Sequence, residues 1–145
     1  VYYKIYGLET IILRYFNVYG NREPVKGHYA PVVGLFLRQK KEGKPFTIVG
    51  DGMQSRDFTH IDDVLNANIL SATTENKKAF GEVFNIGTGD GYTILWIAHA
   101  LGGKIEHIPE RLGEAKHTLA DNYKARDILN WKPTKTLKSY IKNLT

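Results

Sequence analysis

The apolar positions of the chain form two kinds of run, one typical of buried strands and one of amphipathic helices. The run ETIILRYFNVY, residues 9–19, is dense in β-branched and aromatic residues without strict alternation, which indicates a parallel strand covered on both faces. EVFNIG at 82–87 has the same character. From Pro31 to Gly43, by contrast, apolar residues recur at helical spacing and the last turn is basic.

Capping and turn residues divide the rest of the chain into short elements. Asp62 or Asp63 can cap a helix that reaches about Thr73, and Thr93 can cap one that ends at Gly102. The remaining elements are a helix end at 1–7, strands at 46–49, 56–61 and 104–108, and helices at 121–129 and 137–144. Because strands alternate with helices and no repeat or linker interrupts them, the sequence predicts one α/β domain over residues 1–145.

Composition narrows the class of protein. The 145 residues are 42% hydrophobic and 24% charged, an ordinary globular balance, and there is no cysteine for disulfides or thiolate metal sites. The net charge of +5 favours an anionic partner, without distinguishing nucleic acid, a membrane surface or a small phosphate. The longest apolar run, residues 31–37, is too short to span a membrane, and Val1 opens a helix rather than a signal peptide. These features predict a cytoplasmic protein.

The glycine loop GTGDG at 87–91 follows a predicted strand and invites a dinucleotide interpretation. The fingerprint GxGxxG would need glycine where Tyr92 stands, so a strand-to-helix turn without a phosphate is the better interpretation. No pair of histidines has helical metal spacing, so no metal site is expected. The lysines at 40, 41 and 44 suit a solvated helix face, although a nucleic-acid patch is an alternative.

Three arginines stand outside the lysine-rich runs. They are Arg14 in the first apolar strand, Arg56 after a glycine turn and Arg111 in PERLGE. A guanidinium binds phosphate through two parallel hydrogen bonds and is favoured over lysine where the ligand is partly buried. Spacing alone leaves a structural ion pair as the alternative for each.

Four motifs together resemble one known family. They are RYFNVYG at 14–20, GDGMQSRDFTHIDDV at 50–64, FNIGTGDG at 84–91 and PERLGEAKHTLAD at 109–121. In this order they resemble the extended short-chain dehydrogenase/reductases. Within that family they are most similar to the NAD-dependent nucleotide-sugar epimerases and dehydratases, such as the UDP-glucose 4-epimerases. The resemblance implies an α/β fold made of the last parallel strands of a Rossmann domain plus a small mixed substrate-binding region.

The resemblance covers the second half of such proteins. Their glycine-rich NAD loop is absent here, and no tyrosine in the chain has a lysine four residues later, so the catalytic YxxxK pair is absent too. The resemblance therefore implies that most of the NAD site lies outside this chain. The implied partners are a nucleotide-diphosphate sugar and either a complementary N-terminal half or further copies of the chain.

Site residues follow from the resemblance, position by position. Phe16 matches the residue against the nicotinamide end of NAD, and Asn17 matches the amide that binds the diphosphate of the sugar nucleotide. Arg56 and Arg111 match the two arginines that clasp the same diphosphate. Arg14 receives no ligand role.

The nucleoside end of the substrate is assigned in the same way. Glu114 matches an acidic residue that contacts the ribose, Thr47 and Val49 match the stretch that lines the base, and Phe58 lies near the base. The resemblance thus implies that this chain anchors a nucleotide-sugar for oxidation at its 4-position. A stand-alone nucleotide-binding module and a basic nucleic-acid binder are the alternatives.

Two positions depart from the family pattern. Asn21 stands where the family usually has proline, and Thr59 where an apolar residue is common. The loop from Gly20 to Tyr29, which borders the sugar in the family, matches no subfamily clearly. Neither the sugar nor the nucleotide can be named from these residues.

Overall fold

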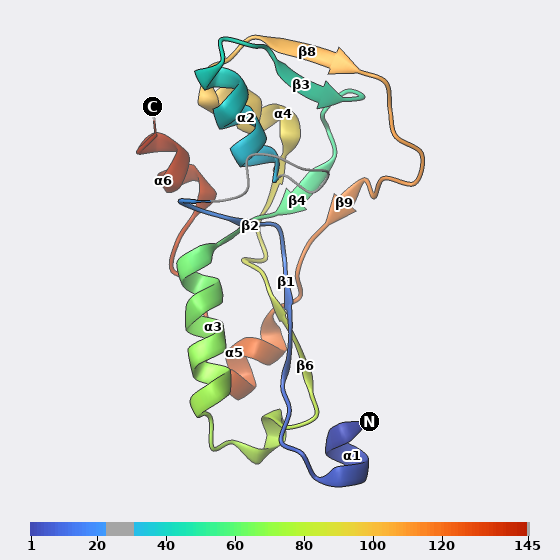
Figure 1. The fold of residues 1–145 in the computed structure, drawn as a ribbon, viewed down its shortest axis with the longest axis vertical. Helices are drawn as coiled ribbons and strands as arrows, with labels where there is room; N and C mark the ends of the chain where they lie inside the picture. Colours follow the sequence, from blue (N-terminus) through green and yellow to red (C-terminus); the bar gives the residue numbers. More distant parts are fainter. Residues whose placement is uncertain (23–30, 145) are drawn as a thin grey trace.

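The computed structural model describes residues 1–22 and 31–144, and the molecule is elongated (Figure 1). Its helices are α1 (Tyr2–Tyr6), α2 (Val32–Lys41), α3 (Ile61–Thr73), the 3₁₀ helix η1 (Lys77–Ala79), α4 (Ile94–Leu101), α5 (Tyr123–Leu129) and α6 (Leu137–Lys142). Its strands are β1 (Ile12–Tyr15), β2 (Val18–Tyr19), β3 (Phe46–Val49), β4 (Ser55–Asp57), β5 (Thr59–His60), β6 (Val83–Ile86), β7 (Gly91–Thr93), β8 (Ile105–Ile108) and β9 (His117–Thr118).

The strands pair across long stretches of sequence. β1 pairs with β6, β2 with β5 and β3 with β8, all in parallel. β4 lies between β7, to which it is antiparallel, and β9, to which it is parallel. Since parallel pairs need crossover connections, usually helices, this topology confirms the mixed α/β class with parallel strands.

One end of the molecule is a closed unit around β3 and β8. Helices α2 and α4 pack beside this strand pair (Figure 1), α6 packs against α4, and together they bury one core. The rings of Phe36 on α2 and Phe46 on β3 are stacked, with their centroids 4.7 Å apart. Lys40 is exposed, as expected for a solvated helix face, and its Nζ also donates to the carbonyl of Leu101 at the end of α4, at 2.8 Å.

The other end contains the β1–β6 pair, with α3 and α5 alongside it (Figure 1). Phe84 and Ile86 of β6 pack with both helices and with Trp131, whose indole Nε1 donates to the carbonyl of Asp63 at 2.9 Å. Tyr15 of β1 donates to Asn68 Oδ1 on α3 at 2.9 Å. The helices therefore cover one face of the pair.

The opposite face of β1 is open in this chain. Ile12, whose side chain alternates with those that face α3, is 48% exposed. The apolar residues of the adjoining α1 segment are also exposed, among them Ile5 and Leu8. The composition of β1 is typical of a strand covered on both faces, but among the described residues only α3 packs on it, and no element covers this second face.

Several local predictions are confirmed and others are not. Gly7 ends α1 in the left-handed conformation, and Thr93 caps α4 by accepting from the backbone N–H of Trp96 at 3.1 Å. The predicted cap of α3 is wrong, because His60 is the cap and its Nδ1 accepts from the N–H of Asp62 at 3.1 Å. The short β7, β9 and η1 were not expected, since elements of two or three residues leave little periodicity to detect.

Candidate functional site

A cavity of about 670 Å³ opens between the β3–α2 end of the molecule and the segments around β2 and β4. This volume is within the usual range for small-molecule sites. Its lining contains all the residues that the sequence assigned to a nucleotide-sugar: Asn17, Thr47, Val49, Arg56, Phe58, Arg111 and Glu114. Segments as far apart in sequence as β2 and the loop after β8 meet here, which sequence spacing alone could not demonstrate.

Two of the singled-out residues do not line this cavity. Phe16, assigned to NAD, follows β1, and its backbone N–H donates to the carbonyl of Ile86 at 3.0 Å. Arg14 is exposed on β1. Of the loop from Gly20 to Tyr29, which the resemblance placed beside the sugar, residues 23–30 lie outside the described part of the chain.

Asn17 occupies a strained backbone position between β1 and β2. Its φ of 26° is in the left-handed region, where residues other than glycine are uncommon. The side-chain Nδ2 donates to the carbonyl of Asp57 at 2.7 Å, and the Asn17 carbonyl accepts from the N–H of Thr59 at 3.3 Å. These two bonds hold Asn17 in the cavity wall against the cost of its backbone conformation.

Asp57, which sequence reasoning did not single out, fixes the glycine loop after β6, and its backbone carbonyl accepts the hydrogen bond from Asn17 in the cavity lining. Its fully buried carboxylate accepts from the N–H and hydroxyl of Thr88 at 2.8 and 2.7 Å, from the N–H of Gly89 at 2.9 Å and from the N–H of Ala120 at 3.1 Å. The amides of the glycine loop thus bind a carboxylate of this chain. A Cβ on Gly87 would lie 2.3 Å from Ala120 Cβ, so only glycine permits this close approach.

Arg56 lies in the wall with its guanidinium already oriented. Nη1 donates to the carbonyls of Ser55 at 2.8 Å and Lys116 at 3.4 Å, and Nη2 lies 3.1 Å from Glu114 Oε1. The Arg56 side chain is only 14% exposed. Since a guanidinium carries five N–H donors, these contacts fix its plane and leave donors for a ligand.

Arg111 and Glu114 belong to the loop between β8 and β9. The loop makes a turn in which the N–H of Glu114 donates to the carbonyl of Arg111 at 3.4 Å, and Gly113 has a φ of +80°. Arg22, which the sequence analysis missed, also lines the cavity. Three arginines against one glutamate make the described lining net positive, which favours an anionic ligand.

The free edge of β3 forms another part of the wall. Gln39 on α2 contacts Thr47 twice: its Nε2 donates to Thr47 Oγ1 at 2.9 Å, and its Oε1 accepts from the Thr47 N–H at 3.3 Å. Gln54 donates from Nε2 to the carbonyl of Val49 at 3.0 Å. Sequence reasoning missed both glutamines, since an isolated amide side chain carries no characteristic spacing.

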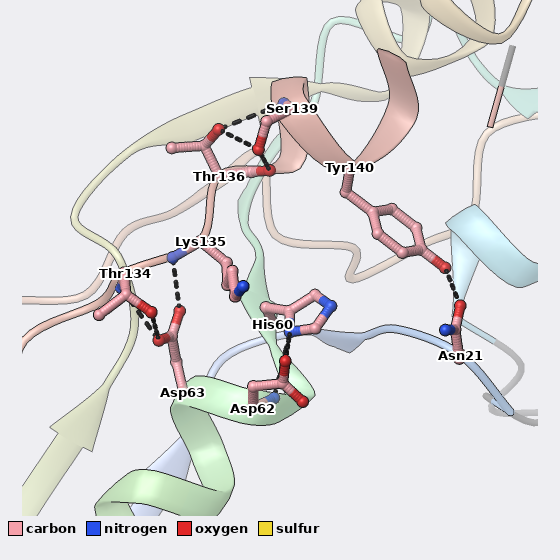
Figure 2. A network of polar contacts seen from close by, with 9 residues as sticks. All are labelled: Asn21, His60, Asp62, Asp63, Thr134, Lys135, Thr136, Ser139 and Tyr140. Carbon is pink, nitrogen blue, oxygen red and sulfur yellow. Dashed lines mark hydrogen bonds and ion pairs between the residues drawn. The ribbon is translucent and has the colours of Figure 1, made fainter. Parts of the chain in front are cut away.

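A polar and aromatic network supports the cavity near β2 and α3 (Figure 2). Asp63 accepts from the N–H and hydroxyl of Thr134 at 2.9 and 2.7 Å and from the N–H of Lys135 at 3.1 Å, which ties the segment before α6 to α3. Tyr140 donates to Asn21 Oδ1 at 3.4 Å. The network therefore fixes Asn21, a residue of the cavity lining, relative to α6.

Tyr19 packs its buried ring edge-on against His60 and Tyr140, with centroids 5.2 and 5.1 Å away. Its hydroxyl has no hydrogen-bond partner among the described residues. Burial, with a smaller contribution from the charge of Asp63, raises the pKa of this hydroxyl above its usual value. The phenol therefore stays neutral in the folded protein.

Residues 1–22 and 31–144 contain no group of three or more His, Asp or Glu side chains placed to hold a metal ion. No helix in the same ranges combines the length and the apolar character needed to cross a membrane.

Comparisons with known proteins agree with these features. Residues 1–87 match the model of the NAD dependent epimerase/dehydratase family. The chain is 35% identical over 148 residues to the UDP-glucuronate 4-epimerase of Thermodesulfobacterium geofontis, covering 97% of this chain and 43% of the relative. It is 32% identical over 139 residues to the UDP-glucose 4-epimerase of Mycolicibacterium smegmatis, covering 92% and 43%. The chain spans less than half the length of these curated relatives.

Solved structures give the same result. The UDP-glucose 4-epimerase of Thermotoga maritima with UDP-glucose superposes with a TM-score of 0.89 at 35% identity, covering 97% of this chain and 46% of that one. The UDP-glucuronic acid 4-epimerase of Bacillus cereus in complex with UDP-glucuronic acid and NAD superposes with a TM-score of 0.80 at 35% identity, covering 99% and 48%. The fold of this chain is therefore part of an epimerase fold.

Proposed function

This chain belongs to the NAD dependent epimerase/dehydratase family, and from that premise we propose that it is the C-terminal, substrate-binding half of a nucleotide-sugar epimerase or dehydratase. Its role is to anchor the diphosphate of an NDP-sugar so that the sugar is presented for oxidation at its 4-position. The assignment to the C-terminal half rests on the sequence, which has neither a YxxxK pair nor the glycine-rich NAD loop.

One observation carries the proposal. Three groups suited to a diphosphate, the guanidinium groups of Arg56 and Arg111 and the amide of Asn17, line a single cavity although they come from three distant parts of the sequence. Paired arginines bind the oxygens of a diphosphate through charge-assisted hydrogen bonds. Because Arg56 is held by two backbone carbonyls and by Glu114, little side-chain entropy remains to be lost when a ligand binds.

Glu114 has a second part in the proposed site. Its carboxylate pairs with Arg56, and one carboxylate has enough lone pairs to accept from other donors as well. A ribose hydroxyl is such a donor. We therefore assign Glu114 to the ribose, in agreement with the resemblance, and to the orientation of Arg56.

The family is NAD dependent, and we assign most of the dinucleotide site to the half of the enzyme that carries the glycine-rich loop. Phe16 is the one residue assigned to NAD, and it lies outside the cavity lining. When bound to the complete enzyme, NAD would accept the hydride from the sugar. The residues of this chain contribute binding and orientation, which hold the reacting carbon in place and so lower the entropic part of the barrier.

The open face of β1 fits the same proposal. Relatives are about twice as long as this chain, and the uncovered side of β1 lies next to α1, whose apolar residues are exposed as well. We assign this surface to the N-terminal half of the enzyme, which would add strands to the free edge of β1 and cover its open face.

Titration calorimetry of the 145-residue chain with UDP tests the proposal. Each charge-assisted contact contributes about 1.5 to 3 kcal/mol, so Arg56→Ala and Arg111→Ala are each expected to weaken binding roughly ten- to a hundredfold. Lys41→Ala is the matched control, since Lys41 is an exposed cation outside the cavity lining. Equal losses for Lys41→Ala and Arg111→Ala would indicate diffuse electrostatics instead of a site.

The same titrations separate the alternatives. Affinity for DNA or RNA that exceeds the affinity for UDP and falls steeply with salt would support the nucleic-acid binder. Turnover is assayed by adding NAD and a UDP-sugar and following keto-sugar formation. We expect no micromolar NAD binding and no turnover from the chain alone. Micromolar NAD binding, or formation of a keto-sugar, would show that the cofactor site has been placed wrongly.

A further inference from the structure

His60 holds the first turn of α3 through a ring nitrogen that faces both a donor and an acceptor. Its Nδ1 accepts from the backbone N–H of Asp62 at 3.1 Å and lies 3.5 Å from Oδ2 of the same residue (Figure 2). The bond from the N–H requires a lone pair on Nδ1, so the imidazole is neutral and carries its proton on Nε2. An imidazolium carries a proton on both nitrogens, and its Nδ1–H can donate only to the carboxylate.

One wall of the cavity rests on the same histidine. Tyr19 of β2 is in register with His60 of β5, and the two rings meet edge-on with their centroids 5.2 Å apart. A Cβ on Gly20 would lie 2.6 Å from Ile61 Cγ2 and 3.6 Å from His60 Nε2, so the Gly20 backbone packs directly against these two side chains. Gly20 and Ile61 both line the cavity. A shift of the imidazole therefore acts on the cavity wall.

Tyr140 of α6 provides a second contact between His60 and the wall. Its ring centroid lies 5.6 Å from that of the imidazole, and its hydroxyl donates to Oδ1 of Asn21, another residue of the cavity lining, at 3.4 Å (Figure 2). The side chain of His60 is only 13% exposed. Because the ring is enclosed by these neighbours, it has little room to turn without moving Tyr140 or Gly20.

Titratable and charged groups face the imidazole from three directions. From α3, the Asp62 carboxylate lies beside it, and the Asp63 carboxylate, one residue further on, accepts from the backbone N–H of Lys135. Lys135, in the segment before α6, is the cation of the network in Figure 2. Tyr19 and Tyr140 pack on the ring from β2 and α6. Of these groups, Asp62 is the one whose oxygen lies close enough to Nδ1 to receive a proton from it in a hydrogen bond.

We propose that His60 is a positioning residue of the cavity wall that responds to pH. Its neutral imidazole caps α3 and supports Gly20 and Tyr140. A proton on Nδ1 replaces the bond from the Asp62 N–H with an ion pair to the Asp62 carboxylate, so the first turn of α3 loses its cap and the wall loosens. Since an imidazole ordinarily titrates at about pH 6.5, the cavity binds its ligand more tightly above that pH than below it. The effect on the ligand rests on the proposed function, whereas the exchange at Nδ1 does not.

Titration calorimetry with UDP-glucose tests the effect on the ligand. Each phosphate of UDP-glucose has a single, strongly acidic hydroxyl, so the charge of the ligand is the same at about pH 8 and about pH 5.5, on either side of the imidazole range. Loss of a helix cap changes an equilibrium several-fold, and we expect the unmodified chain to bind about three- to tenfold more weakly at the lower pH. His60→Asn keeps an acceptor for the Asp62 N–H and does not titrate, so it should lose this dependence. His99→Asn, at an exposed position on α4 outside the cavity lining, is the matched control and should retain it.

Heteronuclear NMR of the isotopically labelled chain without ligand tests the exchange at Nδ1. We expect the Nε2–H tautomer of His60 at neutral pH, and amide signals of Asp62 and Gly20 that change with the same midpoint as the ring. Asp62→Asn keeps the backbone N–H and removes the carboxylate that stabilises the imidazolium, so it should move this midpoint to lower pH.

Two results would overturn the inference. One is an Nδ1–H tautomer of His60 at neutral pH. The other is a pH dependence of UDP-glucose binding that is the same in His60→Asn as in the unmodified chain, because it would then come from other groups. If the unmodified chain binds UDP-glucose at neither pH, the proposed function fails, and the titrations of the ring and of the Gly20 amide decide by themselves whether His60 moves the wall.

Discussion

The two parallel strand pairs at opposite ends of the molecule differ in how their faces are covered. Phe46 and Ile48 of β3 are fully buried, because α2 and α4 pack against that face of the strand and α6 completes the core beside α4. β1 has α3 on one face only, and Ile12, which points to the opposite face, is about half exposed. Both strands are rich in β-branched and aromatic residues, so strand composition alone does not reveal which one is completed by its own chain.

The difference separates two tasks within one chain. The closed β3–β8 unit supplies a wall of the cavity through Thr47 and Val49, and its packing is provided by residues of this chain. β1 leads into Asn17, which also lines the cavity. The outer face of β1, however, is not covered by any of the described residues. The lining of a cavity can thus be assembled within a chain whose sheet leaves one face uncovered.

The largest expected effect is on the closed unit. Phe46→Ala removes a fully buried ring that is stacked on Phe36, and is expected to lower the free energy of unfolding by about 3 to 5 kcal/mol. Ile12→Ala, on the open face, is expected to lower it by less than about 1 kcal/mol. Urea unfolding followed by circular dichroism measures both. Similar losses for the two variants would mean that the face of Ile12 is covered in solution.

The open face leads to the second prediction, which concerns association. An unpaired strand edge beside exposed apolar side chains promotes self-association. Roughly 25 cal/mol per Å² over a few hundred Å² amounts to several kcal/mol, comparable with the stability of a small domain. We therefore expect the isolated chain to form oligomers and to bind a hydrophobic dye, as measured by light scattering and fluorescence.

A matched pair of variants locates this association. Ile12→Lys places a charge on the open face and is expected to reduce both oligomer formation and dye binding. Leu112→Lys places the same charge on the exposed loop that borders the cavity and should change neither. A monodisperse unmodified chain that binds no dye would mean that β1 is covered within the chain, and the assignment to half of an enzyme would need to be replaced.

Much of the local structure could be predicted because its signals lie within a few residues. The turns at Gly7 and Gly102 and the strand 46–49 were predicted at or near their observed bounds. The cap of α3 was mispredicted because Asp63, a good cap by residue type, points into the body and accepts hydrogen bonds from Thr134 and Lys135. The orientation of Asp63 depends on its contact with Thr134, a residue 71 positions away in the sequence, and local sequence patterns carry no information about such a contact.

Some residues in and near the cavity could likewise be found from the sequence, and others only from the structure. Arg56, Arg111 and Glu114 could be found because they stand in recognisable motifs. Asp57 could not be recognised as the hydrogen-bond acceptor of the glycine loop, because its partners come from β6–β7 and from the segment before α5. That Arg56 pairs with Glu114 likewise emerges only from the fold. Residue identity thus indicated side chains that line the cavity, whereas the role of the buried Asp57 carboxylate in fixing the glycine loop required the structure.

A smaller effect is expected where the cavity wall meets the closed core. Tyr19→Phe removes a buried hydroxyl without a partner among the described residues, and is expected to raise the free energy of unfolding by about 1 kcal/mol at neutral pH. The folded-state pKa of Tyr19 is raised, so above the unfolded value of about 10 its hydroxyl ionises more readily in the unfolded chain than in the folded protein. The free energy of unfolding therefore falls as the pH rises above that value. Urea unfolding at neutral and alkaline pH should show a weaker alkaline loss in Tyr19→Phe; a steeper loss would contradict the assignment.

The smallest effect is expected at the ion pair that ties the open β1–β6 pair to α5. The side chain of Lys124 binds the Glu82 carboxylate, which lowers the pKa of Glu82, with Lys4 of α1 adding to the effect. A lowered folded-state pKa gives stability that is present above the unfolded value of about 4.3 and is lost as the pH falls through the folded value. Since both side chains are exposed, salt should screen most of the contribution. Acid unfolding of the chain and of Glu82→Gln, each at low and high salt, should therefore differ slightly at low salt and not at high salt. A difference that persists at high salt would show that the pair is shielded from solvent, and the β6–α5 contact would then be less open than the face of β1 beside it.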